Sequence, residues 1–155
     1  MEIKIRLNDH KYRYDVYKMF NIYFALDELK FVDDGEYIIN IEENKITFAF
    51  NGYYKESLIG ENIKEDIKRL VFESLKDITG EEHPWGILVG IRPYKIALKY
   101  LNEGKSNEEI VEIFKEKHLA AREKAELCIE VAKAEESFVN TDEKKIAIYV
   151  GMAFC

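Results

Sequence analysis

The chain has 155 residues, 47% hydrophobic and 34% charged, a composition typical of a packed globular protein rather than a disordered one. Its apolar runs, such as residues 146–150, are far shorter than the roughly 20 apolar residues that a membrane-spanning helix needs. With 30 acidic and 23 basic residues the net charge is −7, which disfavours non-specific binding to nucleic acid.

The N-terminus alternates charged and apolar residues from Glu2 to Leu7 and lacks the basic stretch and apolar core of a secretory signal. We therefore expect a cytoplasmic protein. The two cysteines, Cys128 and Cys155, are too few for the disulfide framework of a small secreted protein, so we expect no disulfide.

The sequence pattern of the first third of the chain predicts both strands and a helix. Apolar residues alternate with charged ones over residues 3–7, which predicts a half-buried strand, and they recur at helical spacing over residues 16–24. After a turn signal, residues 37–42 and 46–51 are predicted to form two strands of a hairpin.

A long helix is predicted next. Asn62 and Glu65 are suited to its N-terminus, apolar residues form one stripe over 63–78, and Gly80 ends it. The order β-α-β-β-α over residues 1–80 predicts an α+β unit in which both helices cover one face of a small antiparallel sheet.

A connection rich in Gly and Pro follows, and then three helices are predicted. The first begins at Pro93 and ends before Gly104. The second begins at a capping box of Ser106 and Glu109, and the third covers residues 120–138.

The end of the chain predicts a strand without a partner. A polar turn leads into the apolar run 145–150, which is typical of a buried parallel strand. We expect residues 145–155 to be disordered, to pair with another chain in a dimer, or to borrow a sheet edge. Three segments result: the α+β unit 1–80, the loop and helical segment 81–139, and the linker and orphan C-terminal strand 140–155.

Two motifs carry a resemblance to a known family. The run from Tyr149 to Cys155, Tyr-x-x-x-x-Phe-Cys, is similar to the Tyr-x-x-Ile-Pro-Phe-Cys that opens the barrel of coproporphyrinogen-oxidase-like radical S-adenosylmethionine proteins. The stretch from Trp85 to Lys95 resembles the W-G-x-x-x-G-x-R-P-x-K block of the coproporphyrinogen dehydrogenase subgroup. The chain thus resembles the N-terminal part of an oxygen-independent coproporphyrinogen III oxidase, ending at the first cysteine of the cluster motif.

The resemblance implies specific chemistry for a longer parent enzyme. Cys155 matches the first of three thiolates that hold a [4Fe–4S] cluster, and Tyr149 matches a tyrosine near the bound S-adenosylmethionine. The parent would cleave this cofactor to a 5′-deoxyadenosyl radical and convert propionate chains of a tetrapyrrole, coproporphyrinogen III, to vinyl groups in haem biosynthesis. Because Met152 and Ala153 replace the family's Ile-Pro, the loop lacks its shaping proline.

The fragment by itself is expected to be inactive and to bind neither cofactor, since a single thiolate cannot hold the cluster. Its expected partners are the tetrapyrrole substrate and the missing barrel of the same chain, with no membrane. The role implied is that of an accessory N-terminal domain. The alternative is a stand-alone module that binds RNA or a protein through a basic edge formed by Arg92, Lys95, Lys99 and Lys105.

An anion site is predicted where the Gly-Ile-Arg-Pro turn meets a helix. Gly90 would leave backbone amides free, and Arg92 and Lys95 would add positive charge for a propionate or a phosphate. The alternative is that Arg92 pairs locally with the acidic residues 81–82.

No other residue set predicts chemistry. The three histidines His10, His83 and His118 are far apart in the sequence, which does not favour a zinc site. Cys128 lies within a predicted helix in an alanine-rich stretch, where a buried thiol that only packs is expected.

Overall fold

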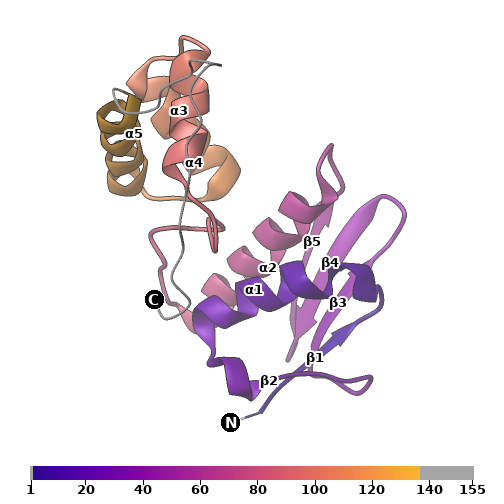
Figure 1. Cartoon of the computed structure of the whole chain (residues 1–155). Coiled ribbons are helices and arrows are strands. Elements are labelled where there is room, and N and C mark those ends of the chain that lie inside the picture. The colour runs from indigo at the N-terminus through magenta and orange to yellow at the C-terminus, as the bar shows by residue number, and fades with distance from the viewer. Residues whose placement is uncertain (1, 137–155) are drawn as a thin grey trace, which may run out of the picture.

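The computed structural model describes residues 2–136, in which five strands form one sheet, the first two α-helices lie on one face of it and three further α-helices follow along the chain (Figure 1). The strands are β1 Ile3–Leu7, β2 Leu29–Phe31, β3 Tyr37–Ile41, β4 Lys45–Phe50 and β5 Tyr53–Leu58. The helices are α1 Arg13–Tyr23, α2 Ile63–Thr79, α3 Tyr94–Asn102, α4 Asn107–His118 and α5 Arg122–Glu136.

The sheet confirms the α+β class but corrects its details. Its order is β2-β1-β3-β4-β5, and β1 runs parallel to both β2 and β3, so the sheet is mixed and not antiparallel. Only β3, β4 and β5 are paired antiparallel. The parallel pairing follows from α1, because a helix that crosses over the sheet between two strands brings the second back in the same direction.

Two strands were missed by the sequence pattern. β2 has three residues, too few to show an alternation. β5 is polar and half exposed, but it follows β4 through Asn51 and Gly52, whose φ angles are 45° and 81°. An Asn-Gly pair at positive φ is a strong hairpin signal, so the sequence did contain the information for β5.

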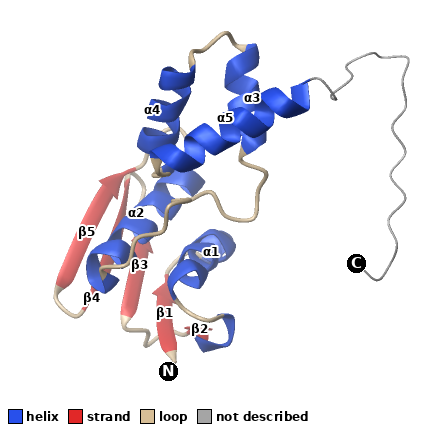
Figure 2. Cartoon of the chain, turned by 90° about the vertical axis from the view of Figure 1, so that its left-hand side faces the viewer, coloured by secondary structure: helices blue, strands red, loops and turns tan. Residues whose placement is uncertain are grey.

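One face of the sheet is covered by α1 and α2, and the core lies between them (Figure 2). Ile5 of β1, Phe48 of β4, Phe20 of α1 and Leu75 of α2 are all fully buried there. Phe20 meets Tyr37 of β3 edge-on, with 5.3 Å between ring centroids. Burial of these apolar surfaces is the main force that holds the layers together.

The predicted helix ends are confirmed. The side chain of Asn62 caps α2 by accepting a hydrogen bond from the Glu65 amide, and Gly80 ends that helix with a φ of 72°. Ser106 and Glu109 form the capping box of α4. Such caps satisfy backbone groups that a helix leaves unpaired at its ends, and they fix where each helix starts.

The last three helices enclose a second apolar cluster. Phe114 and Ile110 of α4 pack there with Ala97 of α3 and Ile129 of α5, and all four are buried. The third predicted helix is confirmed as far as Glu136. The predicted strand 145–150 lies outside the described residues, and the division after residue 80 stays a prediction.

No helix within residues 2–136 combines the length and the apolar character required to cross a membrane.

Candidate functional site

The loop between α2 and α3 is anchored to the turn between α4 and α5. The Ile87 amide donates to the His118 carbonyl at 2.9 Å, and the Ala121 amide donates to the Pro84 carbonyl at 2.8 Å. Gly86 has a φ of 55°, and a Cβ atom placed on it would lie 2.1 Å from the His118 carbonyl oxygen. Only glycine fits this close approach, so the first glycine of the block serves packing.

The start of the loop also contacts the α+β unit. The ring of His83 meets Tyr23 of α1 edge-on, with 4.5 Å between centroids. Tyr23 donates its hydroxyl to the Phe72 carbonyl of α2 at 3.2 Å, and burial, with smaller contributions from Glu81 and Asp77, raises its pKa. The loop is therefore held from two sides.

A groove with a volume of about 470 Å³ runs along this loop. Its lining is apolar except for one imidazole: Ile22, His83, Pro84, Trp85, Gly86, Leu88, Val89, Gly90, Ile91 and Pro93. Ile91 is 49% exposed, which is unusual for so large an apolar side chain. The size and the apolar lining are typical of sites that bind small molecules or peptide segments.

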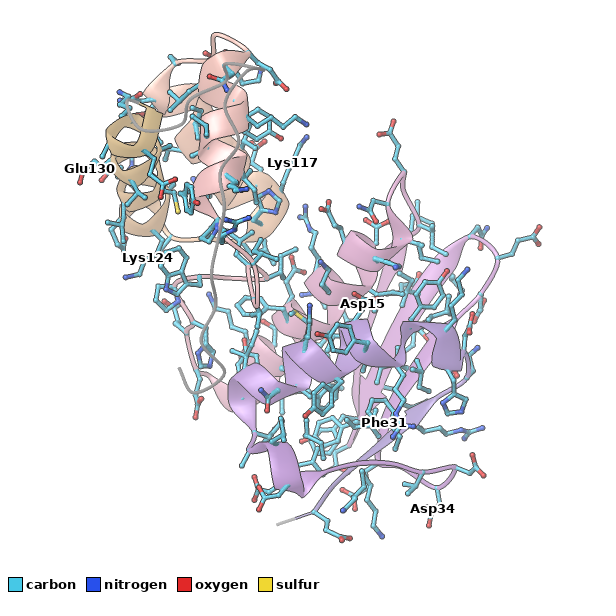
Figure 3. All side chains as sticks on the ribbon, viewed as in Figure 1. Asp15, Phe31, Asp34, Lys117, Lys124 and Glu130 are labelled. Atoms are coloured by element: carbon cyan, nitrogen blue, oxygen red, sulfur yellow. The ribbon has the colours of Figure 1, made fainter. Side chains whose placement is uncertain are left out.

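Cations lie around the groove. The ammonium of Lys18 is 3.9 Å from where a Cβ on Gly90 would sit, and that of Lys124 lies 5.3 Å from the centroid of the Trp85 ring. Lys124, labelled in Figure 3, is on the first turn of α5, next to the loop. Arg92 is exposed beside the groove. These three side chains bring positive charge close to the groove, and one carboxylate, that of Glu81, lies 3.5 Å from His83 in its lining.

The structure separates the three predicted anion-site residues. Gly90 lines the groove, whereas Lys95 lines a different hollow on α3 together with Lys99. Arg92 lies in the sequence between them and lines neither of these hollows. Sequence reasoning missed Lys18, which is 72 positions before Gly90 and shows no local signal.

The structure does not show the alternative prediction that Arg92 pairs with the acidic residues 81–82. Glu82 pairs with Lys76 at 2.7 Å, and Glu81 approaches His83 at 3.5 Å. Within residues 2–136 no carboxylate pairs with Arg92. Its guanidinium therefore remains available to a ligand.

A larger hollow of about 680 Å³ lies between α2, β5 and the α4–α5 turn, but its charges neutralise one another. Lys55 bridges Glu73 and Asp77 at 3.0 and 3.2 Å. A hydrogen bond from the Tyr53 hydroxyl at 2.7 Å, aided by Lys55, lowers the pKa of Asp77. This hollow offers a ligand less uncompensated charge than the groove does.

The described residues do not form a metal centre. Between residues 2 and 136 no three His, Cys, Asp or Glu side chains come together as a metal would require. Cys128 is 2% exposed, and burial raises the pKa of its thiol, which makes it a packing residue. The predicted ligand Cys155 and its neighbour Tyr149 lie outside the described residues.

His118, whose carbonyl accepts from the loop, is 8% exposed and packs edge-on against Phe114. Burial lowers the pKa of its imidazole from the ordinary 6.5. The charged side chains that act on it are Glu65, Lys68, Arg69 and Lys117. Glu65 favours the charged imidazole and the three cations disfavour it.

The burial of His118 predicts a pH dependence of stability. Because the unfolded chain binds this proton at about pH 6.5 and the folded chain only at lower pH, the stabilisation is complete above that pH and is lost as the pH falls through the folded pKa. Urea unfolding should therefore give a lower free energy of unfolding at about pH 5.5 than at about pH 7.5. His118→Gln should reduce the difference, and His10→Gln, at an exposed position, should not. An unchanged difference in His118→Gln would contradict this assignment.

Comparison with known proteins gives a partial match. The chain is 32% identical over 96 residues to the oxygen-independent coproporphyrinogen-III oxidase-like protein HemZ of Bacillus subtilis (strain 168). The match covers 60% of this chain and 19% of that relative, so the chain spans a small part of the relative's length. No family model matches, and no solved structure matches.

Proposed function

We propose that this chain is the N-terminal part of a larger radical S-adenosylmethionine enzyme of the oxygen-independent coproporphyrinogen oxidase type. The observation that carries the proposal is the 32% identity to a protein of that name over 96 residues. Two motifs in the sequence also support it: the Trp-Gly to Pro-x-Lys block at residues 85–95 and the Phe-Cys at residues 154–155.

The cluster chemistry belongs to the parent enzyme and not to the described residues. A [4Fe–4S] cluster held by three thiolates supplies the electron that cleaves S-adenosylmethionine. Cys155 would be one of these thiolates, and Tyr149 would lie near the cofactor. The other ligands must come from sequence beyond Cys155, because Cys128 is buried in the helical cluster.

The proposed reaction of the parent is the oxidative decarboxylation of coproporphyrinogen III to protoporphyrinogen IX. In it, the described part of this chain would act as an accessory domain that receives the substrate. Its groove offers an apolar floor, and Arg92 and Lys18 offer cations without a carboxylate partner among residues 2–136. A guanidinium and an ammonium beside an apolar surface suit a molecule that carries propionates on a hydrophobic ring.

The experiment that tests the proposal uses the chain extended past Cys155. After anaerobic reconstitution with iron and sulfide, we expect the absorption of a [4Fe–4S] cluster and reductive cleavage of S-adenosylmethionine. Cys155→Ser should abolish both, whereas Cys128→Ser, at a buried packing position, should retain both.

The absence of a cluster in the extended chain would contradict the proposal. Strongly salt-dependent RNA binding by such a chain would instead favour the binding module. The basic edge of that alternative is partly neutralised, since Lys99 lies 3.8 Å from Glu103.

A further inference from the structure

The two edges of the sheet differ in how well they are protected from association. One edge is β2, with three residues, and the other is β5, with six residues, which among residues 2–136 pairs with β4 alone (Figure 2). Short strands, prolines and outward lysines commonly protect a free edge. β5 has no proline, and its lysine, Lys55, is held on the helix-covered face by Glu73 and Asp77 of α2 at 3.0 and 3.2 Å. The edge of β5 is therefore open to another strand.

Three residues of β5 direct their backbone groups to this edge. The Ile59 amide donates to the Asn44 carbonyl at 3.0 Å, and in the register of the two strands alternate residues from 53 to 59 form the hydrogen-bonded pairs with β4. The amides of Tyr54, Glu56 and Leu58 consequently point away from β4. They are placed as the donors that a further strand would need.

The side chains of these three residues lie on the face of the sheet opposite α1 and α2. Tyr54 is 59% exposed and Leu58 is 76% exposed, so two large apolar side chains stand in water on one edge strand. Between them, the Glu56 carboxylate accepts from the Tyr54 hydroxyl at 2.8 Å and lies 3.4 Å from the Lys45 ammonium of β4. This edge therefore combines apolar surface with unused strand donors.

We propose that this edge binds the same edge of a second copy of the chain, so that two antiparallel β5 strands join two sheets into one. The strand is self-complementary, because Tyr54 and Leu58 lie two residues to either side of Glu56. When the two copies of Glu56 are opposite each other, each Tyr54 lies beside Leu58 of the second copy, and the backbones form about six hydrogen bonds. The inference does not rest on the proposed function.

The charges and the symmetry of this contact favour a dimer. Two glutamates opposite each other repel, but each Glu56 has Lys45 of its own copy beside it, which offsets the repulsion. The carboxylates disfavour a polyanion such as RNA at the same edge. Since the contact uses the same surface on both copies, it closes after two chains and does not continue into a fibre.

The first experiment measures mass by sedimentation equilibrium at total concentrations from about 1 μM to about 1 mM. We expect the mass of the 155-residue chain, and that of the chain extended past Cys155, to rise toward twice the monomer mass. Glu56→Pro should keep both at the monomer mass, because it removes an outward amide and no bond to β4, and proline is tolerated at such edge positions. A monomer over the whole range, or a dimer that Glu56→Pro leaves unchanged, would overturn the proposal.

A matched pair of side-chain variants tests which edge is used. Leu58 on β5 is 76% exposed and Leu26, just before β2, is 61% exposed, so aspartate at either position should leave the fold intact. Leu58→Asp should weaken association about tenfold or more, because the packing against Tyr54 is lost twice in a symmetric dimer. Leu26→Asp should leave association unchanged. The reverse result would place the contact at the β2 edge and would contradict the assignment to β5.

Hydrogen exchange at single amides tests the contact directly. The amides of Tyr54, Glu56 and Leu58 should exchange more slowly as the protein concentration rises, whereas the amides of β2 should not change. Protection of the three amides that is independent of concentration would show that another segment of the same chain occupies the edge. That result would overturn the dimer.

Discussion

Phe114→Ala is expected to lower the free energy of unfolding of the helical cluster by about 3–5 kcal/mol. Phe114 is fully buried in α4, among the side chains of α3 and α5. Its removal leaves a cavity that small neighbours such as Ala97 and Ala125 are poorly placed to fill. Urea unfolding followed by hydrogen exchange at single amides measures both the size and the location of the loss.

The matched variant is Phe20→Ala, at a fully buried position in the sheet cluster. If the chain divides after residue 80 as predicted, each variant should release amides mainly in its own cluster. A uniform loss of protection over both clusters in either variant would contradict the division. It would show instead that the loop at residues 83–93 couples the two clusters into one cooperative unit.

Helix ends were predictable because their signals are local. Asn62 and Gly80 delimit α2, and Ser106 with Glu109 begins α4, as their positions in the sequence indicate. Each cap depends on residues within one turn of the helix end, so no knowledge of the rest of the fold is needed.

The sheet was less predictable because its strands are placed by distant contacts. β2 pairs with β1 through three residues, and the direction of β3 follows from the path of α1 between them. Neither property is encoded in an alternation of apolar residues. β5 differs from the other strands in this respect. Its polar sequence does not indicate a strand, but the Asn51-Gly52 turn before it is a local signal for a hairpin.

Only the part of the candidate site that depends on local sequence signals was predicted. The loop and Gly90 were identified from the glycine and proline pattern, and both lie at the groove. Lys18 and Lys124 reach it from α1 and α5, and only the fold brings them there. The spacing of Arg92 and Lys95 suggested one anion site, but Gly90 lines the groove, Lys95 lines a different hollow on α3, and Arg92 lines neither of them.

Gly86 provides the sharpest test of the loop's anchoring. Alanine there would have to adopt a φ of 55°, which costs about 1–2 kcal/mol for a residue with a side chain. Its Cβ would also meet the His118 carbonyl oxygen at 2.1 Å and the Leu119 backbone at 2.5 Å. Backbone atoms cannot rotate away as a side chain can, so the loop must shift from the turn.

The expected result of Gly86→Ala is a loss of about 3 kcal/mol or more in the free energy of unfolding, the sum of backbone strain and forced displacement. Gly104→Ala is the matched control, because Gly104 has a φ of 80° and no atom near its would-be Cβ. The loss of stability in Gly104→Ala therefore measures the backbone strain alone, which is about 1–2 kcal/mol. Equal losses in the two variants, measured by urea unfolding, would show that the contact with His118 is not tight. A larger loss in Gly86→Ala, together with greater exposure of Trp85 to acrylamide, would establish that this contact holds the groove in shape.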